Sequence, residues 1–155
     1  MKRIVIACVI ILFVVVGFAH AQNRGTAEEA RAMLDKAIAF YKANGPGKAF
    51  AAFNDPKGAF VNKDLYVFAV DLNGKVLAHG ANAELIGKNM AEIRDENKKN
   101  FIAEMLTVVK AKSEGTVTYR WANPQFSLIE EKCSYIEKVE GAILGCGYYR
   151  WEPQD

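Results

Sequence analysis

Two short apolar segments joined by Asn-Gly constrain the fold of this chain more than any other feature. Leu65–Val70 is apolar on both faces, and Lys75–His79 follows directly after Asn73-Gly74. Asn-Gly between two such segments is typical of a type I′ turn, whose twist suits two antiparallel strands. The sequence therefore predicts a β-hairpin over residues 65–79.

Three more strands are expected at the C-terminal end of the chain. They are Thr116–Trp121, Glu131–Lys138 and Ala142–Tyr149, the last two joined by a short turn around Glu140-Gly141. Side chains alternate along a strand, so Val117, Tyr119 and Trp121 share one face of the first of these strands.

Helical spacing of apolar residues occurs in two other places. Thr26 and Glu29 form a capping box in front of a helix that Asn44–Gly47 ends, with a short helical piece after it. A second helix is expected over about Asn97–Lys112, with the charged run Arg94–Lys99 as its solvated start. Hairpin-linked strands with helices outside them indicate an α+β domain, an antiparallel sheet covered by helices.

The first 21 residues have the composition of a secretory signal. Lys2 and Arg3 precede an uninterrupted apolar run of 15 residues, Ile4–Phe18, and Ala19-His20-Ala21 offers a cleavage site before Gln22. Fifteen apolar residues are short for a membrane span, which needs about 20, although an uncleaved anchor is the alternative. We expect residues 1–21 to be removed and residues 22–155 to form one periplasmic or secreted domain.

Composition excludes several classes of function. The 155 residues include 20 basic and 18 acidic ones, and the signal contains two of the basic residues, so residues 22–155 are electrically balanced. A nucleic-acid partner is not expected, because it would need a concentrated basic surface. With His20 in the signal, His79 is the one histidine left, which argues against a multi-histidine metal site. The chain has no Cys-x-x-Cys-His haem motif, glycine-rich phosphate loop or nucleophile elbow, so we expect neither a cofactor nor an enzyme.

Aromatic residues on the expected strands are the candidates for a binding site. Tyrosine and tryptophan bury a large area but keep a polar tip that needs a hydrogen-bond partner. A small ligand with two oxygens can supply that partner in a concave pocket. The candidates on one face of the sheet are Tyr66, His79, Tyr119, Trp121 and Tyr135, and the alternative is that each is an ordinary core residue.

Arg120 is a further candidate, because a guanidinium binds a carboxylate with two parallel hydrogen bonds. Strand parity places Arg120 on the opposite face of the strand from Trp121. Its side chain therefore reaches the same pocket only if the strand twists or bulges before Pro124. On the second strand of the first hairpin, the same parity groups His79 with Lys75 and Leu77.

Two cysteines, Cys133 and Cys146, lie in the last two strands. A two-residue turn at Val139-Glu140 places them directly opposite each other, whereas a four-residue turn over Val139–Ala142 places them one diagonal step apart. A disulfide needs Cβ atoms roughly 3.5–4.5 Å apart, which favours the first register. The sequence leaves open a disulfide and a pair of buried thiols.

Taken in order, these segments resemble single Cache domains of the second type. The resemblance covers about residues 26–150 and lies in the central hairpin, the linker after it, an aromatic-proline strand end and the last two strands: Leu65–His79, Leu85–Asn89, Tyr119–Pro124, Ser134–Val139 and Gly145–Tyr149. It implies a PAS-like fold in which a long N-terminal helix packs on a five-stranded antiparallel sheet, with a ligand pocket on the other face.

The resemblance also implies a function. Members of this family sense small molecules outside the cell, often short organic acids, as input domains of chemoreceptors and histidine kinases. By analogy the ligand binds at Tyr66, His79, Tyr119, Trp121 and Tyr135, with Arg120 as a further candidate. Because no membrane helix follows Trp151, we expect a soluble binding protein that presents its bound state to a membrane receptor or kinase. The alternatives are an exported structural or interaction module without a ligand, and a thiol enzyme that uses Cys146.

Overall fold

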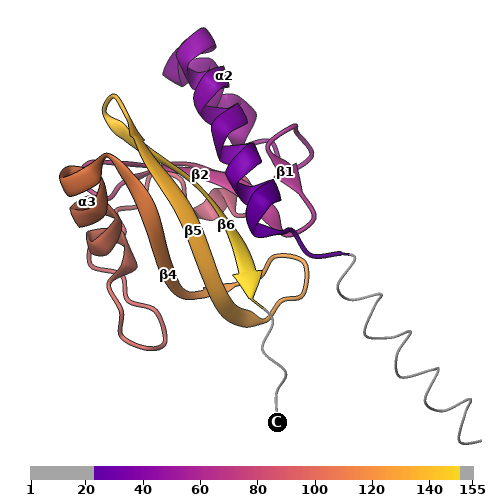
Figure 1. Cartoon of the computed structure of the whole chain (residues 1–155), viewed down its shortest axis with the longest axis vertical. Coiled ribbons are helices and arrows are strands. Elements are labelled where there is room, and N and C mark those ends of the chain that lie inside the picture. Colours follow the sequence, from indigo (N-terminus) through magenta and orange to yellow (C-terminus); the bar gives the residue numbers. More distant parts are fainter. Residues whose placement is uncertain (1–22, 151–155) are drawn as a thin grey trace, which may run out of the picture.

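The computed structural model describes residues 23–150, which form one antiparallel sheet with a helix on each face (Figure 1). The predicted signal, residues 1–21, lies outside the described residues. In chain order the elements are α2 (Ala27–Phe53), β1 (Val61–Asn62), β2 (Leu65–Asp71), β3 (Val76–His79), the 3-10 turn η1 (Ala83–Leu85), α3 (Phe101–Lys112), β4 (Glu114–Ala122), β5 (Ile129–Val139) and β6 (Ala142–Arg150).

All strand pairs are antiparallel, and the sheet order is β1-β2-β6-β5-β4, with β3 also paired to β2. The five strands predicted from the sequence are β2 to β6, and β1 adds a pair of residues at the edge. The predicted PAS-like α+β fold is therefore confirmed.

Helix α2 begins where the capping box predicted. Thr26 Oγ1 accepts a hydrogen bond from the Glu29 amide at 3.2 Å, and the Glu29 carboxylate accepts one from the Thr26 amide at 2.9 Å. Gly45 leaves the helical conformation, with φ 77° and ψ 167°, directly before Pro46. The break predicted there is a kink within one long helix, because helical geometry resumes after the proline.

Helix α3 begins later than the sequence predicted. Its N-cap is Asn100, whose side-chain oxygen accepts from the Ala103 amide at 3.0 Å. The charged run Arg94–Lys99 is not the start of the helix but a loop. The Asp95 carboxylate organises that loop by accepting from the backbone amides of Lys99 and Arg120, both at 2.9 Å.

A β-bulge changes which residues of β3 face α3. Phe68 pairs with His79 and Ala69 with Ala78, but Val70 pairs with Val76, so Leu77 is the extra residue. An extra residue reverses the side-chain alternation beyond it. His79 therefore shares its face with Val76, and the predicted grouping with Leu77 is wrong, because Leu77 packs on the α2 side.

Each face of the sheet carries its own core. On the α2 face, buried side chains of the helix pack against those of the strands, chiefly Leu34, Ile38, Tyr41, Leu65, Val67, Leu144 and Cys146. On the α3 face the corresponding cluster includes Phe68, Phe101, Met105, Val117, Tyr119 and Ile143. None of the helices within residues 23–150 is long and apolar enough to cross a membrane.

Candidate functional site

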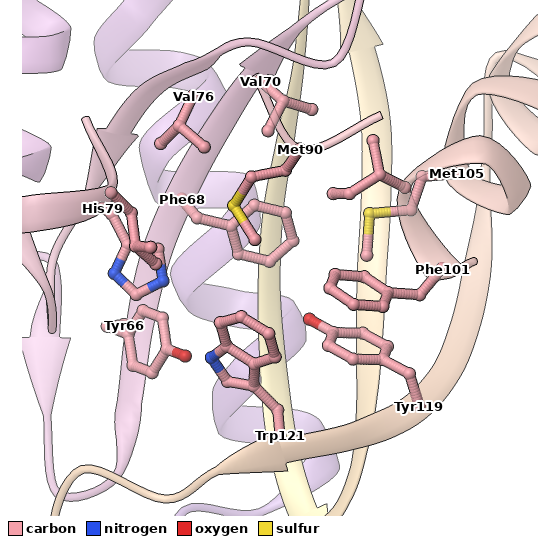
Figure 2. A pocket seen from close by; sticks show the side chains of 12 residues that line it. Tyr66, Phe68, Val70, Val76, His79, Met90, Phe101, Met105, Tyr119 and Trp121 are labelled. Atoms are coloured by element: carbon pink, nitrogen blue, oxygen red, sulfur yellow. The ribbon is translucent and has the colours of Figure 1, made fainter. Parts of the chain in front are cut away.

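A cavity lies between the α3 face of the sheet and the segments that cover it (Figure 2). Its walls are mostly apolar and come from β2, β3, β4, α3 and the loop before α3: Tyr66, Phe68, Val70, Val76, His79, Leu85, Met90, Phe101, Ile102, Met105, Tyr119 and Trp121. Its free volume is about 30 Å³. A single water needs about 10–15 Å³ on the same measure, so the cavity admits a small group without any movement of the walls.

His79 presents a neutral ring to this cavity. Its Nδ1 accepts from the backbone amides of Asn82 at 2.9 Å and Ala81 at 3.3 Å, so the ring proton is on Nε2. Burial, helped by the nearby charge of Lys132, lowers the pKa of His79 to about 3. The imidazole is therefore uncharged at neutral pH and offers one N–H donor.

Two tyrosines and a tryptophan direct polar atoms towards the cavity (Figure 2). Tyr119 stacks on Phe101 with ring centroids 4.3 Å apart, and its hydroxyl lies 3.0 Å from Ser134 Oγ. Burial raises the pKa of Tyr119, so this hydroxyl stays protonated. Trp121 meets Phe101 edge to face at 5.3 Å and closes one side of the site.

Lys132 is the unusual residue of this face. It is 0% exposed, and its Nζ lacks any hydrogen-bond partner within residues 23–150. The ammonium lies 3.7 Å from the ring centroid of Tyr66, 5.1 Å from that of Tyr149 and 5.6 Å from that of Phe68. Two of these rings, Tyr66 and Phe68, line the cavity. The positive charge therefore lies against the wall of the cavity.

Strand geometry explains how a lysine comes to be buried here. In β5, Lys132 alternates with Cys133 and shares its face with Ser134. Gly147 of β6 pairs with Ser134, and a Cβ at Gly147 would collide with Ser134 Oγ and with Lys132 Cε. Glycine at position 147 thus leaves the room through which the lysine chain extends towards Tyr66. Gly147 is therefore a point of close packing between β5 and β6.

A buried and unpaired charge is expensive. Removing an ammonium from water costs several kcal/mol even after relaxation, and cation–π contacts of about 2 kcal/mol return only part of that cost. Burial disfavours the charged form of Lys132, whereas its neighbours Tyr66 and Tyr119 favour it, and the pKa of the amine lies above its ordinary value. The structure therefore holds a positive charge, next to a cavity, that an anion would stabilise.

Four of the six predicted site residues lie in the cavity wall, namely Tyr66, His79, Tyr119 and Trp121. Tyr135 does not, because it packs on the α2 face beside Tyr148, with ring centroids 6.2 Å apart. Arg120 also points away from the cavity, as strand parity predicted. Its guanidinium donates to the Glu96 carboxylate at 2.7 Å and to the Ile129 carbonyl at 3.0 Å.

Cys133 and Cys146 are both free thiols. The turn is Glu140-Gly141, and Val139 pairs with Ala142, so Cys133 faces Tyr148 and Cys146 faces Tyr135. This is the diagonal register, and it removes the argument for a disulfide that directly opposed cysteines would have given. Burial raises the pKa of Cys146 to about 12, which leaves the thiol protonated and weakly nucleophilic.

Lys132 was not predicted from the sequence, and neither were the residues that α3 and the loop before it add to the cavity, Met90, Phe101, Ile102 and Met105. The helical residues have the same pattern as any core face. Lys132 did carry a signal, because a lysine in phase with Ser134 and Ile136 occupies an inward position of its strand. Within residues 23–150 we find no group of three or more histidine, cysteine, aspartate or glutamate residues arranged to bind a metal.

The model of the family described as single Cache domain 2 matches residues 9–151. This chain belongs to the single Cache domain 2 family. Among curated proteins, the methyl-accepting chemotaxis protein McpP of Pseudomonas putida is 35% identical over 88 residues, which are 56% of this chain. The aligned region is only 16% of McpP, so the chain corresponds to a small part of that receptor.

Solved structures of related domains share the fold. A methyl-accepting chemotaxis protein from Vibrio parahaemolyticus superposes with a TM-score of 0.67 at 25% identity, covering 79% of this chain and 86% of the other. A Cache chemosensory domain whose structure was described as the basis for carboxylic acid recognition has a TM-score of 0.62 at 28% identity, with the same coverages of 79% and 86%.

Proposed function

We propose that this domain binds a short organic acid outside the cytoplasm, with the ligand carboxylate paired to Lys132. The observation that carries the proposal is the unpartnered Lys132 ammonium, 0% exposed, against Tyr66 and Phe68 of the cavity wall. A carboxylate is the anion that would offset the cost of burying this charge. The carboxylic acid recognised by a structurally similar Cache domain supports the same class of ligand.

The other walls have clear roles in this proposal. The Nε2–H of His79 and the hydroxyls of Tyr66 and Tyr119 are donors for carboxylate or carbonyl oxygens. The aromatic rings and the two methionines enclose the carbon chain. Because the free volume is about 30 Å³, a ligand of a few carbons requires some rearrangement. The flexible side chains of Met90 and Met105 can supply it.

The biological role that we propose is sensing. The likeness to part of a chemotaxis receptor and to a Cache chemosensory domain supports a sensor rather than an enzyme. We propose that residues 1–21 direct export, that residues 22–155 act as a periplasmic or secreted binding domain, and that the bound state is presented to a membrane receptor or histidine kinase.

A thermal-shift panel tests the binding step. Acetate, propionate, pyruvate and lactate are compared with acetamide and propionamide, which have a similar shape but no charge. A ligand that binds only the folded state at 100 times its dissociation constant adds about 2.7 kcal/mol to the free energy of unfolding. We expect at least one acid to raise the melting temperature and its amide to have no effect.

If no acid on the panel changes the melting temperature, the proposal fails and an interaction module without a ligand is favoured instead. Equal shifts for an acid and its amide would place the recognition on the apolar walls and not on Lys132.

A further inference from the structure

A second buried polar group lies where β4 ends and α2 begins. It consists of Arg24, Asp64, Asn123 and Glu130, and we call it the Asn123 cluster. The Asn123 side-chain amide donates to Asp64 Oδ2 at 3.0 Å and to Glu130 Oε2 at 2.8 Å. The guanidinium of Arg24 donates to both carboxylate oxygens of Glu130 at 2.8 Å, and the Gly25 amide donates to Asp64 Oδ1 at 2.7 Å.

The cluster fixes the start of α2. Asp64 and Asn123 are 0% exposed and Glu130 is 7% exposed, so each of these bonds replaces water that the groups have lost. Burial alone would raise the pKa of Glu130, but the hydrogen bonds from Arg24 and Asn123 outweigh it and lower that pKa. Residues 24 and 25 directly precede the N-cap, Thr26. The segment that enters α2 is therefore held by Glu130 of β5 and by Asp64 of the β1–β2 turn, and Asn123, directly after β4, joins these two carboxylates.

A chain of hydrogen bonds connects this cluster to the cavity. Tyr149 donates its hydroxyl proton to the carbonyl of Ala122 at 2.8 Å, and Ala122 directly precedes Asn123. The hydroxyls of Tyr66 and Tyr149 are 3.2 Å apart. Because the one hydroxyl proton of Tyr149 is used on Ala122, Tyr66 is the donor in this pair. Tyr66 lines the cavity, so a single tyrosine separates the ligand site from the strand end that carries Asn123.

We propose that the Asn123 cluster reports occupancy of the cavity to residues 24 and 25, an inference that rests on the proposed function. The hydroxyl of Tyr66 can donate only one hydrogen bond, either to the Tyr149 hydroxyl or to a carboxylate in the cavity. The ammonium of Lys132 likewise lies against the ring of Tyr149 until an anion draws it away. Binding therefore removes two contacts from Tyr149, the residue that holds the end of β4 beside Asn123.

These two arrangements are the two states that coupling between sites requires, and the ligand favours one of them because its carboxylate accepts the hydrogen bond of the Tyr66 hydroxyl. In the ligand-free state the bond from Tyr66 to Tyr149 supports the Ala122 carbonyl, and the cluster holds the Gly25 amide. In the bound state that support is lost and the hold on Gly25 loosens. The change reaches the N-terminal end of α2 without any movement of α3.

The first test needs no ligand. Hydrogen exchange of the Gly25 amide is compared in the wild type, in Tyr149→Phe, and in Tyr41→Phe as the matched control. Tyr41 also loses a hydroxyl bonded to a side chain, the Glu140 carboxylate at 3.3 Å, but Glu140 lies in the β5–β6 turn and neither residue belongs to the cluster. Tyr149→Phe is expected to speed Gly25 exchange by about 5-fold or more, relative to the Ala69 amide in β2, and Tyr41→Phe is not. Tyr66→Phe, which removes the other hydroxyl, should act like Tyr149→Phe.

If Tyr149→Phe and Tyr66→Phe leave Gly25 exchange unchanged relative to Ala69, or if Tyr41→Phe has the same effect, the proposed coupling is wrong. The second test adds propionate to the wild type, with binding measured calorimetrically on the same sample. Faster exchange at Gly25 on binding supports the proposal. Binding with no change at Gly25 overturns it and leaves the proposed function intact. Absence of binding by propionate and the other short acids overturns the proposed function, and with it the reporting of occupancy.

Discussion

The two faces of the sheet bury similar apolar material but treat polar groups differently. On the α2 face the buried side chains are apolar or, like Tyr41, bonded to a partner within the described chain. On the α3 face a fully buried ammonium, Lys132, has no partner within residues 23–150. A protein tolerates such a cost where the group serves a purpose other than stability. The comparison supports the proposal that α2 stabilises the domain and that the α3 face, which we call the binding face, holds the ligand.

The largest expected effect on stability comes from a substitution in the apolar core of the α2 face. Leu34 lies in the middle of α2, is 0% exposed and packs within the apolar cluster of that face. Leu34→Ala is expected to lower the free energy of unfolding by about 2–5 kcal/mol. Affinity for an acid should stay the same in the folded fraction, as measured by denaturant unfolding and calorimetry on one preparation. A selective loss of affinity without loss of stability would contradict the division between the faces.

The next prediction concerns the binding face, where one substitution should weaken acid binding and at the same time raise the free energy of unfolding. Lys132→Met keeps the length of the side chain and removes the charge. Loss of a buried charge-assisted bond should weaken acid binding by about 100-fold. Replacing an unpaired buried charge with an apolar group should also raise the free energy of unfolding, by about 1 kcal/mol or more.

The control for this variant is Lys138→Met on the same strand and in the same alternation, where the side chain is exposed. It should change neither affinity nor stability beyond about 0.5 kcal/mol. A Lys132→Met protein that is less stable than the wild type, and that binds acids normally, would show that Lys132 is structural.

The free energy of unfolding should also depend on pH through His79, which lies on the binding face and is uncharged in the folded protein. Its pKa is about 3 in the folded protein against an ordinary value of 6.5, so the unfolded chain binds a proton that the folded one does not. Stability is therefore complete above pH 6.5 and falls as the pH drops from 6.5 towards 3. The contribution lost between pH 7 and pH 5 is about 2 kcal/mol.

His79→Asn isolates this contribution, because the asparagine oxygen can replace Nδ1 as the acceptor for the Ala81 and Asn82 amides. Urea unfolding at pH 7 and pH 5 should show the extra loss in the wild type and not in the variant. Identical pH dependence in the two proteins would mean that His79 titrates normally.

The smallest effect is expected from Tyr135, which the sequence analysis placed in the site and the structure places on the α2 face. Tyr135→Phe should change acid affinity and stability by no more than about 0.5 kcal/mol. Tyr119→Phe removes a buried hydroxyl bonded to Ser134 and should cost about 1 kcal/mol of stability and weaken binding. Equal effects of the two substitutions in a titration with propionate would place Tyr135 back in the site.

Local patterns in the sequence predicted much of the fold. The hairpin forms across Asn73-Gly74, but its turn is not the predicted type I′, because Gly74 has a positive φ of 85° and Asn73 does not. This hairpin, the capping box at Thr26 and the alternation that puts Tyr119 with Trp121 are each specified by a few neighbouring residues. These features depend on backbone conformation and on strand periodicity alone. The four predicted site residues that line the cavity all lie on strands, where the alternation of side chains shows which residues share a face.

The errors lie where one segment must be placed relative to another. The alternation of β5 groups Tyr135 with Cys133 but does not say which face of the sheet that group occupies. The bulge at Leu77 and the position of the β5–β6 turn each depend on a single residue, and either one reverses a face or shifts a register. Lys132 was missed because a lysine is assigned to solvent unless the structure shows what surrounds it.

Pairing of a ligand carboxylate with Lys132 is tested most simply on the Lys132 side chain itself. With 15N- and 13C-labelled protein, the Lys132 ammonium and Cε signals are recorded by NMR during a titration with propionate, and then with propionamide. We expect a shift that saturates with the calorimetric dissociation constant for the acid, no shift for the amide, and loss of the assigned signal in Lys132→Met. Binding of propionate with the Lys132 signals unchanged would contradict it.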